Sequence, residues 1–209
     1  MELVKAEGEL VGQYAEEIPA LAWSTGPSSY QYHFGRRALF DALVLRSWAT
    51  PSTLFSADAT TLALENGQLL GIAITMLGPE FRERSAALGP LWPEMIGAGE
   101  VAEDEIAEVI EHSKLASWLN PVIYSNTYYV HAIAVKPEAR GKHVGVALME
   151  NAMAIGRELG CTEFQLDVLS DNPAVGFYQS LGLEVLVQSH APKPAAAGVP
   201  TEYRMGKAL

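Results

Sequence analysis

The 209-residue chain has a single cysteine, Cys161. One thiol cannot form an internal disulfide, so we expect a reducing compartment and take the location to be cytoplasmic. Positive charge is also scarce, because 14 Lys and Arg residues stand against 25 Asp and Glu residues, giving a net charge of −11. Nucleic-acid binding draws on clustered basic side chains, so this composition argues against a nucleic-acid partner.

Long apolar runs are missing as well. No segment approaches the roughly 18 to 20 apolar residues that cross a bilayer, and the first residues, MELVKAEGELVGQYAEE, mix acidic with apolar side chains. We therefore expect neither a signal peptide nor membrane association. Apolar residues still make up 49% of the chain, which is enough for a full core, and the length suits one domain over residues 1–209.

Three common site motifs are absent. There is no Gly-Lys-Ser/Thr after a four-residue spacer, as a Walker A loop requires, and no Gly-x-Gly-x-x-Gly fingerprint near a first strand. No group of His, Cys and carboxylate residues has the spacing of metal ligands, so the sequence predicts no metal site.

The first half of the chain predicts helices followed by a hairpin. Apolar residues at helical spacing predict one helix near residues 10–21 and another over 37–48, joined by a loop at 24–35. Asn66-Gly67 lies between two apolar runs and predicts a pair of antiparallel strands at 60–64 and 69–77.

A helical insertion is expected at about residues 80–125. It contains an apolar stripe that includes Ile106, Val109 and Ile110, beside many Glu and Asp residues. The acidic face has two interpretations, a simple solvated surface or a lid that attracts a cationic acceptor.

The clearest pattern runs from Thr127 to the C-terminus. Residues 127–135 are apolar on both faces, which is typical of a central strand, and a helix from Val144 to Gly160 leads to a second strand at 164–169. Two strands joined through a helix in this way lie parallel. A short helix follows, and a hairpin of residues 183–189 and 201–207 ends the chain. The fold class is therefore α/β with a mixed sheet.

The turn before the long helix has the features of an anion site. Backbone N–H groups from Gly141 to Val146 would converge at the helix start, where the dipole favours negative charge. Arg140 and Lys142 add positive charge to an acidic protein, which suits a pyrophosphate. The simpler alternative is a Gly-rich turn that only packs the helix against the sheet.

Two motifs in this region resemble those of the GNAT family of N-acetyltransferases. Residues 140–145, RGKHVG, are similar to the family's Arg/Gln-x-x-Gly-x-Gly/Ala loop, and Tyr178 followed by Leu-Gly-Leu at 181–183 is similar to its later motif. The likeness is good over about residues 127–209. It implies a mixed, strongly twisted central sheet flanked by helices, with the helical insertion after the third strand.

The resemblance also implies acetyl-CoA as cosubstrate, bound between the two central parallel strands. Asn172, or its neighbour Asp171, would touch the pantetheine arm, and Tyr178 would lie near the thiol. His143 departs from the family pattern, because it stands where the loop usually has its middle glycine. The main chain of three strand residues would pair with the pantetheine amides: Ile133, Ala134 and Val135. Seven loop residues would hold the diphosphate: Arg140, Gly141, Lys142, His143, Val144, Gly145 and Val146.

Acyl transfer to an amine needs a neutral nitrogen, a donor for the developing oxyanion and a proton for the leaving thiolate. Tyr178 offers a phenolic proton. His131 is the leading candidate for the base, because we expect it to share a strand face with Ile133 and Val135, although a core histidine bonded to main chain is an equal alternative. Asp167 is a second candidate base.

We therefore expect an N-acetyltransferase whose acceptor, a primary amine of a small molecule or of a peptide N-terminus or lysine, attacks the thioester directly. The alternative is a sensor or scaffold of the same fold that binds acyl-CoA without turnover. Exposed edges in the C-terminal hairpin could also pair two copies into a homodimer.

Overall fold

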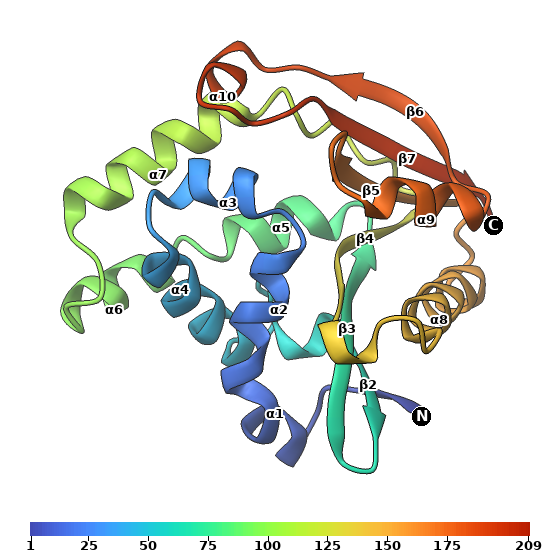
Figure 1. Cartoon of the computed structure of the whole chain (residues 1–209). Coiled ribbons are helices and arrows are strands. Elements are labelled where there is room, and N and C mark those ends of the chain that lie inside the picture. Colours follow the sequence, from blue (N-terminus) through green and yellow to red (C-terminus); the bar gives the residue numbers. More distant parts are fainter.

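A computed structural model describes all 209 residues, and its seven strands form one mixed sheet in the order β1-β2-β3-β4-β5-β7-β6 (Figure 1). Every neighbouring pair is antiparallel except β4 and β5, which run parallel. The strands are β1 (Glu2–Lys5), β2 (Thr60–Glu65), β3 (Gln68–Leu77), β4 (Thr127–Val135), β5 (Glu163–Leu169), β6 (Glu184–Ser189) and β7 (Glu202–Ala208).

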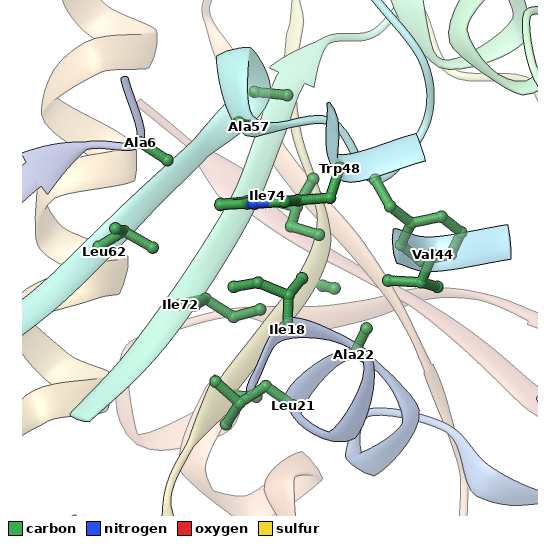
Figure 2. Packing of buried hydrophobic residues seen from close by; sticks show 14 of the residues in the cluster. Ala6, Ile18, Leu21, Ala22, Val44, Trp48, Ala57, Leu62, Ile72 and Ile74 are labelled. Atoms are coloured by element: carbon green, nitrogen blue, oxygen red, sulfur yellow. The ribbon is translucent and has the colours of Figure 1, made fainter. Parts of the chain in front are cut away.

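The N-terminal helices cover one face of β2, β3 and β4, here called the α2–α4 face (Figure 1). They are α1 (Glu9–Tyr14), α2 (Ile18–Ser24), α3 (Pro27–Phe34) and α4 (Arg37–Ala49). Figure 2 shows Ile18 of α2 and Trp48 of α4 packed on Ile72 and Ile74 of β3. The Trp48 indole N–H also donates to the carbonyl of Val11, so this large side chain is buried without an unpaired donor.

The other face, here called the α8 face, is covered by α8 (Val144–Glu158) and α9 (Ala174–Ser180) (Figure 1). The α8 helix is amphipathic, and Leu148, Met149 and Ala152 are among the side chains it buries. Because the sheet is covered on both faces here, β4 is a nearly continuous apolar run, whereas β5 alternates Phe164, Leu166 and Val168 with polar residues.

The expected insertion consists of three helices between β3 and β4: α5 (Glu80–Ala86), α6 (Leu91–Gly97) and α7 (Glu103–Ala116). Ile106 and Val109 of α7 are buried as expected, but Ile110 is 46% exposed. The insertion is anchored to α4 by Arg46, whose guanidinium donates two hydrogen bonds, of 2.8 and 2.9 Å, to the Glu100 carboxylate. No helix in the protein is both long and apolar enough to span a membrane.

The Asn66-Gly67 hairpin, both later strands and the parallel β4–β5 pair confirm the sequence predictions. Asn66 and Gly67 have φ of 52° and 74°, the positive values that a tight hairpin turn requires. The predicted loop at 24–35 is wrong, because Pro27–Phe34 form α3. None of its residues is fully buried, and its sequence accordingly shows no apolar stripe from which a helix could be predicted. Two further short elements were also missed: β1 and α10 (Pro192–Ala196).

A glycine at position 71 lets β3 lie close to β4. A Cβ there would come within 2.5 Å of the Ala134 carbonyl oxygen, which belongs to the backbone and cannot swing away. We expect Gly71→Ala to lower the free energy of unfolding by about 1–3 kcal/mol, as overpacking does, measured by urea denaturation.

Gly12→Ala is the matched control. Gly12 lies in α1, and a Cβ added there would have no other atom within 4 Å, so alanine should leave stability unchanged or raise it by up to about 1 kcal/mol. If Gly71→Ala unfolded together with the wild type, the close β3–β4 approach would be refuted.

Candidate active site

The β4–β5 ladder is short. The parallel pairs run only from Thr127–Glu163 to Val130–Leu166, although β4 continues to Val135 and β5 to Leu169. Beyond Val130 the strands part, so the edge of β4 facing β5 has no partner strand. The predicted pantetheine residues Ile133, Ala134 and Val135 lie on this free stretch, where their backbone groups can bind an extended ligand.

The predicted diphosphate loop lies between β4 and α8. Gly141 has φ of +78°, a left-handed conformation that explains a glycine there. The first helical hydrogen bond runs from the Ala147 N–H to the His143 carbonyl. The N–H groups of residues 143–146 therefore have no acceptor within the helix. Arg140, Lys142 and His143 are exposed around this helix start. The arrangement suits an anion, and the diphosphate contact stays a prediction.

Gly145 allows close packing between two helices. A Cβ at this position would lie 3.3 Å from the Phe177 ring, so the small residue lets α8 pack closely against α9. Val144 is buried, whereas Val146 is partly exposed beside the loop.

His131 occupies a β-bulge, and the prediction that it shares a face with Ile133 and Val135 is wrong. The pairing of β4 with β3 passes from Val130–Thr75 to Ala132–Ile74 and leaves His131 without a partner residue. The extra residue reverses the alternation, so Ile133 remains on the α8 face while His131 packs on the α2–α4 side.

The His131 ring lies among aromatic side chains. Its centroid is 5.0 Å from that of Phe55 and 5.8 Å from that of Phe81. Burial lowers the pKa of the imidazole to about 4, so His131 is neutral at pH 7. Its Nε2 atom is buried and has no hydrogen-bond partner. The main-chain partner that a core histidine would have is therefore missing at this nitrogen, although the atom is enclosed by protein.

Tyr178 lies on α9 and is buried in the cluster of the α8 face. Burial raises the pKa of its phenol, which therefore stays protonated throughout the ordinary pH range. The hydroxyl has no hydrogen-bond partner in the protein and is not fully enclosed. A buried ring with an unengaged hydroxyl is suited to donate to a ligand.

Asn172 is engaged by protein groups rather than free. Its side-chain oxygen accepts from the Ala174 N–H at 2.9 Å, and its side-chain nitrogen donates to the Thr25 carbonyl at 3.2 Å. The residue thereby fixes the start of α9 to the chain before α3. Asp171, the alternative pantetheine contact, is exposed.

Asp167 is held in a buried ion pair. The Arg204 guanidinium donates to both of its carboxylate oxygens, at 2.5 and 2.8 Å. The Tyr129 hydroxyl donates to the same carboxylate at 2.9 Å, and Asn120 adds a bond of 3.3 Å. Both carboxylate oxygens already accept hydrogen bonds from the protein, so Asp167 is better suited to hold Arg204 and Tyr129 in place than to act as the base.

Glu202, at the start of β7, is a residue that the sequence analysis missed. It alternates with Tyr203 and Met205, which pack on the α8 face, so it points to the α2–α4 side with Arg204. Burial, together with the charge of Asp167, raises the pKa of its carboxyl to about 8, although Arg204 opposes the shift. No sequence signal marks this residue, because its environment comes from α3, β4 and β5.

His143 is the N-cap of α8 and has φ of 60° and ψ of 16°. Few non-glycine residues adopt this left-handed conformation, and β-branched residues tolerate it worst. We expect His143→Val to lower the free energy of unfolding by at least about 1 kcal/mol in thermal melts, whereas His143→Gly stays within about 1 kcal/mol of the wild type or exceeds it. Equal melting of the valine and glycine variants would rule out this backbone conformation.

Comparisons with known proteins agree with this geometry. The family model for the acetyltransferase (GNAT) family matches residues 20–183. The chain is 36% identical over 62 residues to a thialysine N-epsilon-acetyltransferase of Sus scrofa, and the match spans 29% of this chain and 36% of that enzyme.

Solved structures share the fold across the whole chain. An N-acetyltransferase from Staphylococcus aureus Mu50 has a TM-score of 0.72 at 12% identity, covering 99% of this chain and 100% of its own. A second acetyltransferase structure has a TM-score of 0.69 at 16% identity, with 100% of both chains covered. The PaiA N-acetyltransferase of Thermoplasma acidophilum, solved in complex with coenzyme A, has a TM-score of 0.55 at 14% identity and covers 100% of this chain and 98% of its own.

The family model matches most of the chain, and the mixed sheet with its parted central strands is the expected fold. The protein belongs to the GNAT acetyltransferase family, whose members take an acetyl group from acetyl-CoA.

Proposed function

We propose that the protein is an N-acetyltransferase that transfers acetyl from acetyl-CoA to a primary amine of a small molecule or peptide. The observation that carries this proposal is the end of the β4–β5 ladder at Val130–Leu166. This end leaves an opening in the sheet close to the start of α8, where an anion can bind. His131 lies on the α2–α4 side of the opening and Tyr178 on the α8 face. A thioester placed in this opening is reached from both faces of the sheet.

The cofactor would lie along the free edge of β4. Backbone groups of Ile133, Ala134 and Val135 bond the pantetheine amides, and residues 140–146 hold the diphosphate. Unpaired N–H groups at the start of α8 and the charges of Arg140 and Lys142 support the second contact. His143 is exposed at the N-cap of α8, so its presence is compatible with the anion.

Direct attack suits the groups that line the opening. The neutral His131 imidazole can accept a hydrogen bond from the acceptor nitrogen through Nε2. The protonated Tyr178 phenol can donate to the thioester and then to the departing thiolate. The two groups approach from opposite faces of the sheet, which matches an acceptor and a leaving group on opposite sides of the reacting carbonyl.

An amine acceptor has support from the related pig enzyme, which is named for acetylating the ε-nitrogen of thialysine. The α7 acids are a weaker guide to the acceptor, because Glu105 is paired with Arg36 while Glu103 and Glu108 are exposed to solvent. The aromatic surroundings of His131 are better evidence, since Phe55 and Phe81 pack on it just past the end of the β4–β5 ladder.

Two further features belong to this proposal. One sheet with its covering helices supports a single domain over residues 1–209. The edge strand β6 carries Leu186 and Val187, which are 48% and 42% exposed, and supports pairing of two copies into a homodimer.

A panel of amines, including alkylamines, polyamines, lysine and peptides with free N-termini, tests the function when each is supplied with acetyl-CoA and free thiol is measured. Release that depends on an amine is the expected result. Thermal stabilisation by acetyl-CoA without release for any amine would instead support the non-catalytic sensor of the same fold.

Tyr178→Phe removes only the phenolic hydroxyl. We expect kcat to fall about 10-fold to 10³-fold with the fastest amine, while the KM for acetyl-CoA changes little, because the proton for the thiolate is needed only as the C–S bond breaks. Tyr124→Phe is the control, since Tyr124 is 69% exposed and its hydroxyl has no hydrogen-bond partner in the protein. An unchanged kcat in Tyr178→Phe would show that another group protonates the thiolate.

A further inference from the structure

Glu202 is a carboxyl group on the α2–α4 side of the central strands that has no partner in the protein. Its backbone is fixed on both sides, since β7 pairs it with Leu169 of β5 and with Ser189 of β6. Its side chain is partly buried, yet no donor in the protein bonds to it. Its oxygens are absent from the fully enclosed unpaired atoms, so they open onto accessible space.

The nearby cation cannot neutralise this carboxyl. The Arg204 guanidinium is two residues away on the same strand, but it donates twice to Asp167, once to Gln165 and once to the Pro121 carbonyl. The other groups that act on Glu202 repel its negative charge or are neutral: Asp167 from β5, Tyr129 from β4 and Tyr30 from α3. A partly buried carboxyl in such surroundings lacks a positive partner.

The position of Glu202 relates it to the opening in the sheet. Asp167 is the first residue of β5 after the last pair with β4, and it bonds both Arg204 of β7 and Tyr129 of β4. Glu202 lies on β7 opposite Leu169, the last residue of β5, and on the same α2–α4 side of the sheet as His131. The carboxyl is therefore next to the stretch of β5 that has parted from β4, on the side where the acceptor is expected.

We propose that Glu202 binds the ammonium group of the acceptor and removes its proton. This inference rests on the proposed N-acetyltransferase function and specifies its substrate as a primary amine that arrives charged. Arg204 and Asp167 act as positioning residues, because they neutralise one another and leave Glu202 as the free charge.

The proton balance is simple. The Glu202 carboxylate takes one proton from R–NH3+, and the neutral nitrogen forms a C–N bond to the thioester carbonyl carbon. As the C–S bond breaks, Tyr178 gives its phenolic proton to the thiolate and takes up the second proton that the nitrogen loses. The products are the amide, the free thiol of coenzyme A and one proton, which Glu202 returns to solvent.

Glu202 matches this task better than His131 does. A base works best when its pKa is close to the working pH, and that of Glu202 is raised to about 8, whereas burial lowers that of His131 to about 4. His131 then orients the nitrogen as a hydrogen-bond acceptor. The neutral form of Glu202 before substrate binds also explains how the free protein tolerates a carboxyl without a partner.

The first test is the pH dependence of kcat/KM for the fastest amine of the panel in Glu202→Gln. In the wild type, kcat/KM should rise with pH and level off near pH 8, where the free carboxyl ionises. The variant has no base and must take the small fraction of amine that is already neutral. Its kcat/KM at pH 7 should fall at least about 10²-fold and keep rising toward the amine's own pKa, about 10.

The second test needs no turnover. Calorimetric titration of the coenzyme A complex with 2-phenylethylamine at pH 7, in two buffers of different ionisation enthalpy, reports the protons released. The wild type should release close to one proton per amine bound, because the ammonium displaces the carboxyl proton. Glu202→Gln should release almost none, whereas Glu202→Asp, which keeps a shortened carboxyl, should retain part of the release and lose more kcat than KM.

Glu184→Gln is the matched control, because Glu184 is an exposed carboxylate on the neighbouring strand β6. The outcomes separate the two hypotheses. A wild type that acetylates no amine refutes the proposed function, while the proton count still tests Glu202 as the ammonium site. A wild type that turns over while Glu202→Gln keeps its kcat/KM, its pH inflection and its proton release overturns the role of Glu202 alone.

Stability provides a check that Glu202→Gln is folded and that the carboxyl titrates as described. A raised pKa in the folded state means that the wild type loses stability as pH rises from the unfolded value, about 4.3, to the folded value near 8. The variant lacks this loss, so its melting temperature should exceed that of the wild type at pH 9 and approach it at pH 5. Parallel melting curves at all pH values would contradict the assignment.

Discussion

The structure depends on where the hydrogen bonding between β4 and β5 stops. A parallel pair in the middle of a sheet normally continues to the end of its shorter strand, because each unpaired backbone group is costly in a buried position. Here four residue pairs hold the strands together, and the remainder of each strand is supported from its outer side, β4 by β3 and β5 by β7. The sheet is thus stable on both sides of an internal gap, and a ligand with amide groups can complete the missing ladder.

The bulge at His131 determines which side chains lie on each face of the sheet beside this gap. Tyr129 already lies on the α2–α4 side, so plain alternation places His131 there too, and the bulge then adds Ala132 to this side and leaves Ile133 on the α8 face. The imidazole packs against Phe55 and Phe81 at the point where β4 parts from β5. A local change in backbone register therefore sets which side chains line each face of the gap.

Much of the fold follows from sequence patterns, and the site follows only in part. Local signals were sufficient for the Asn66-Gly67 turn, for α8 with its apolar stripe and for the loop at 140–146, because each depends on residues close in the chain. The placement of His131 and Ile133 on opposite faces could not be predicted, since a bulge is a property of the β3–β4 pair and leaves no mark in the alternation of β4 alone. Glu202 was missed for the same reason, because its environment is built by three other elements. The helix α3 was missed because it lacks a buried stripe.

The contact between Gly145 and Phe177 couples the two helices that carry the sequence motifs. Phe177 precedes Tyr178 on α9, and its ring lies 3.3 Å from where a Cβ at position 145 would be. The first turn of α8 and the residue beside Tyr178 are therefore closely packed. A larger residue at 145 would push Phe177, and with it the neighbouring phenol, away from α8, so this second glycine sets the spacing between the two motifs.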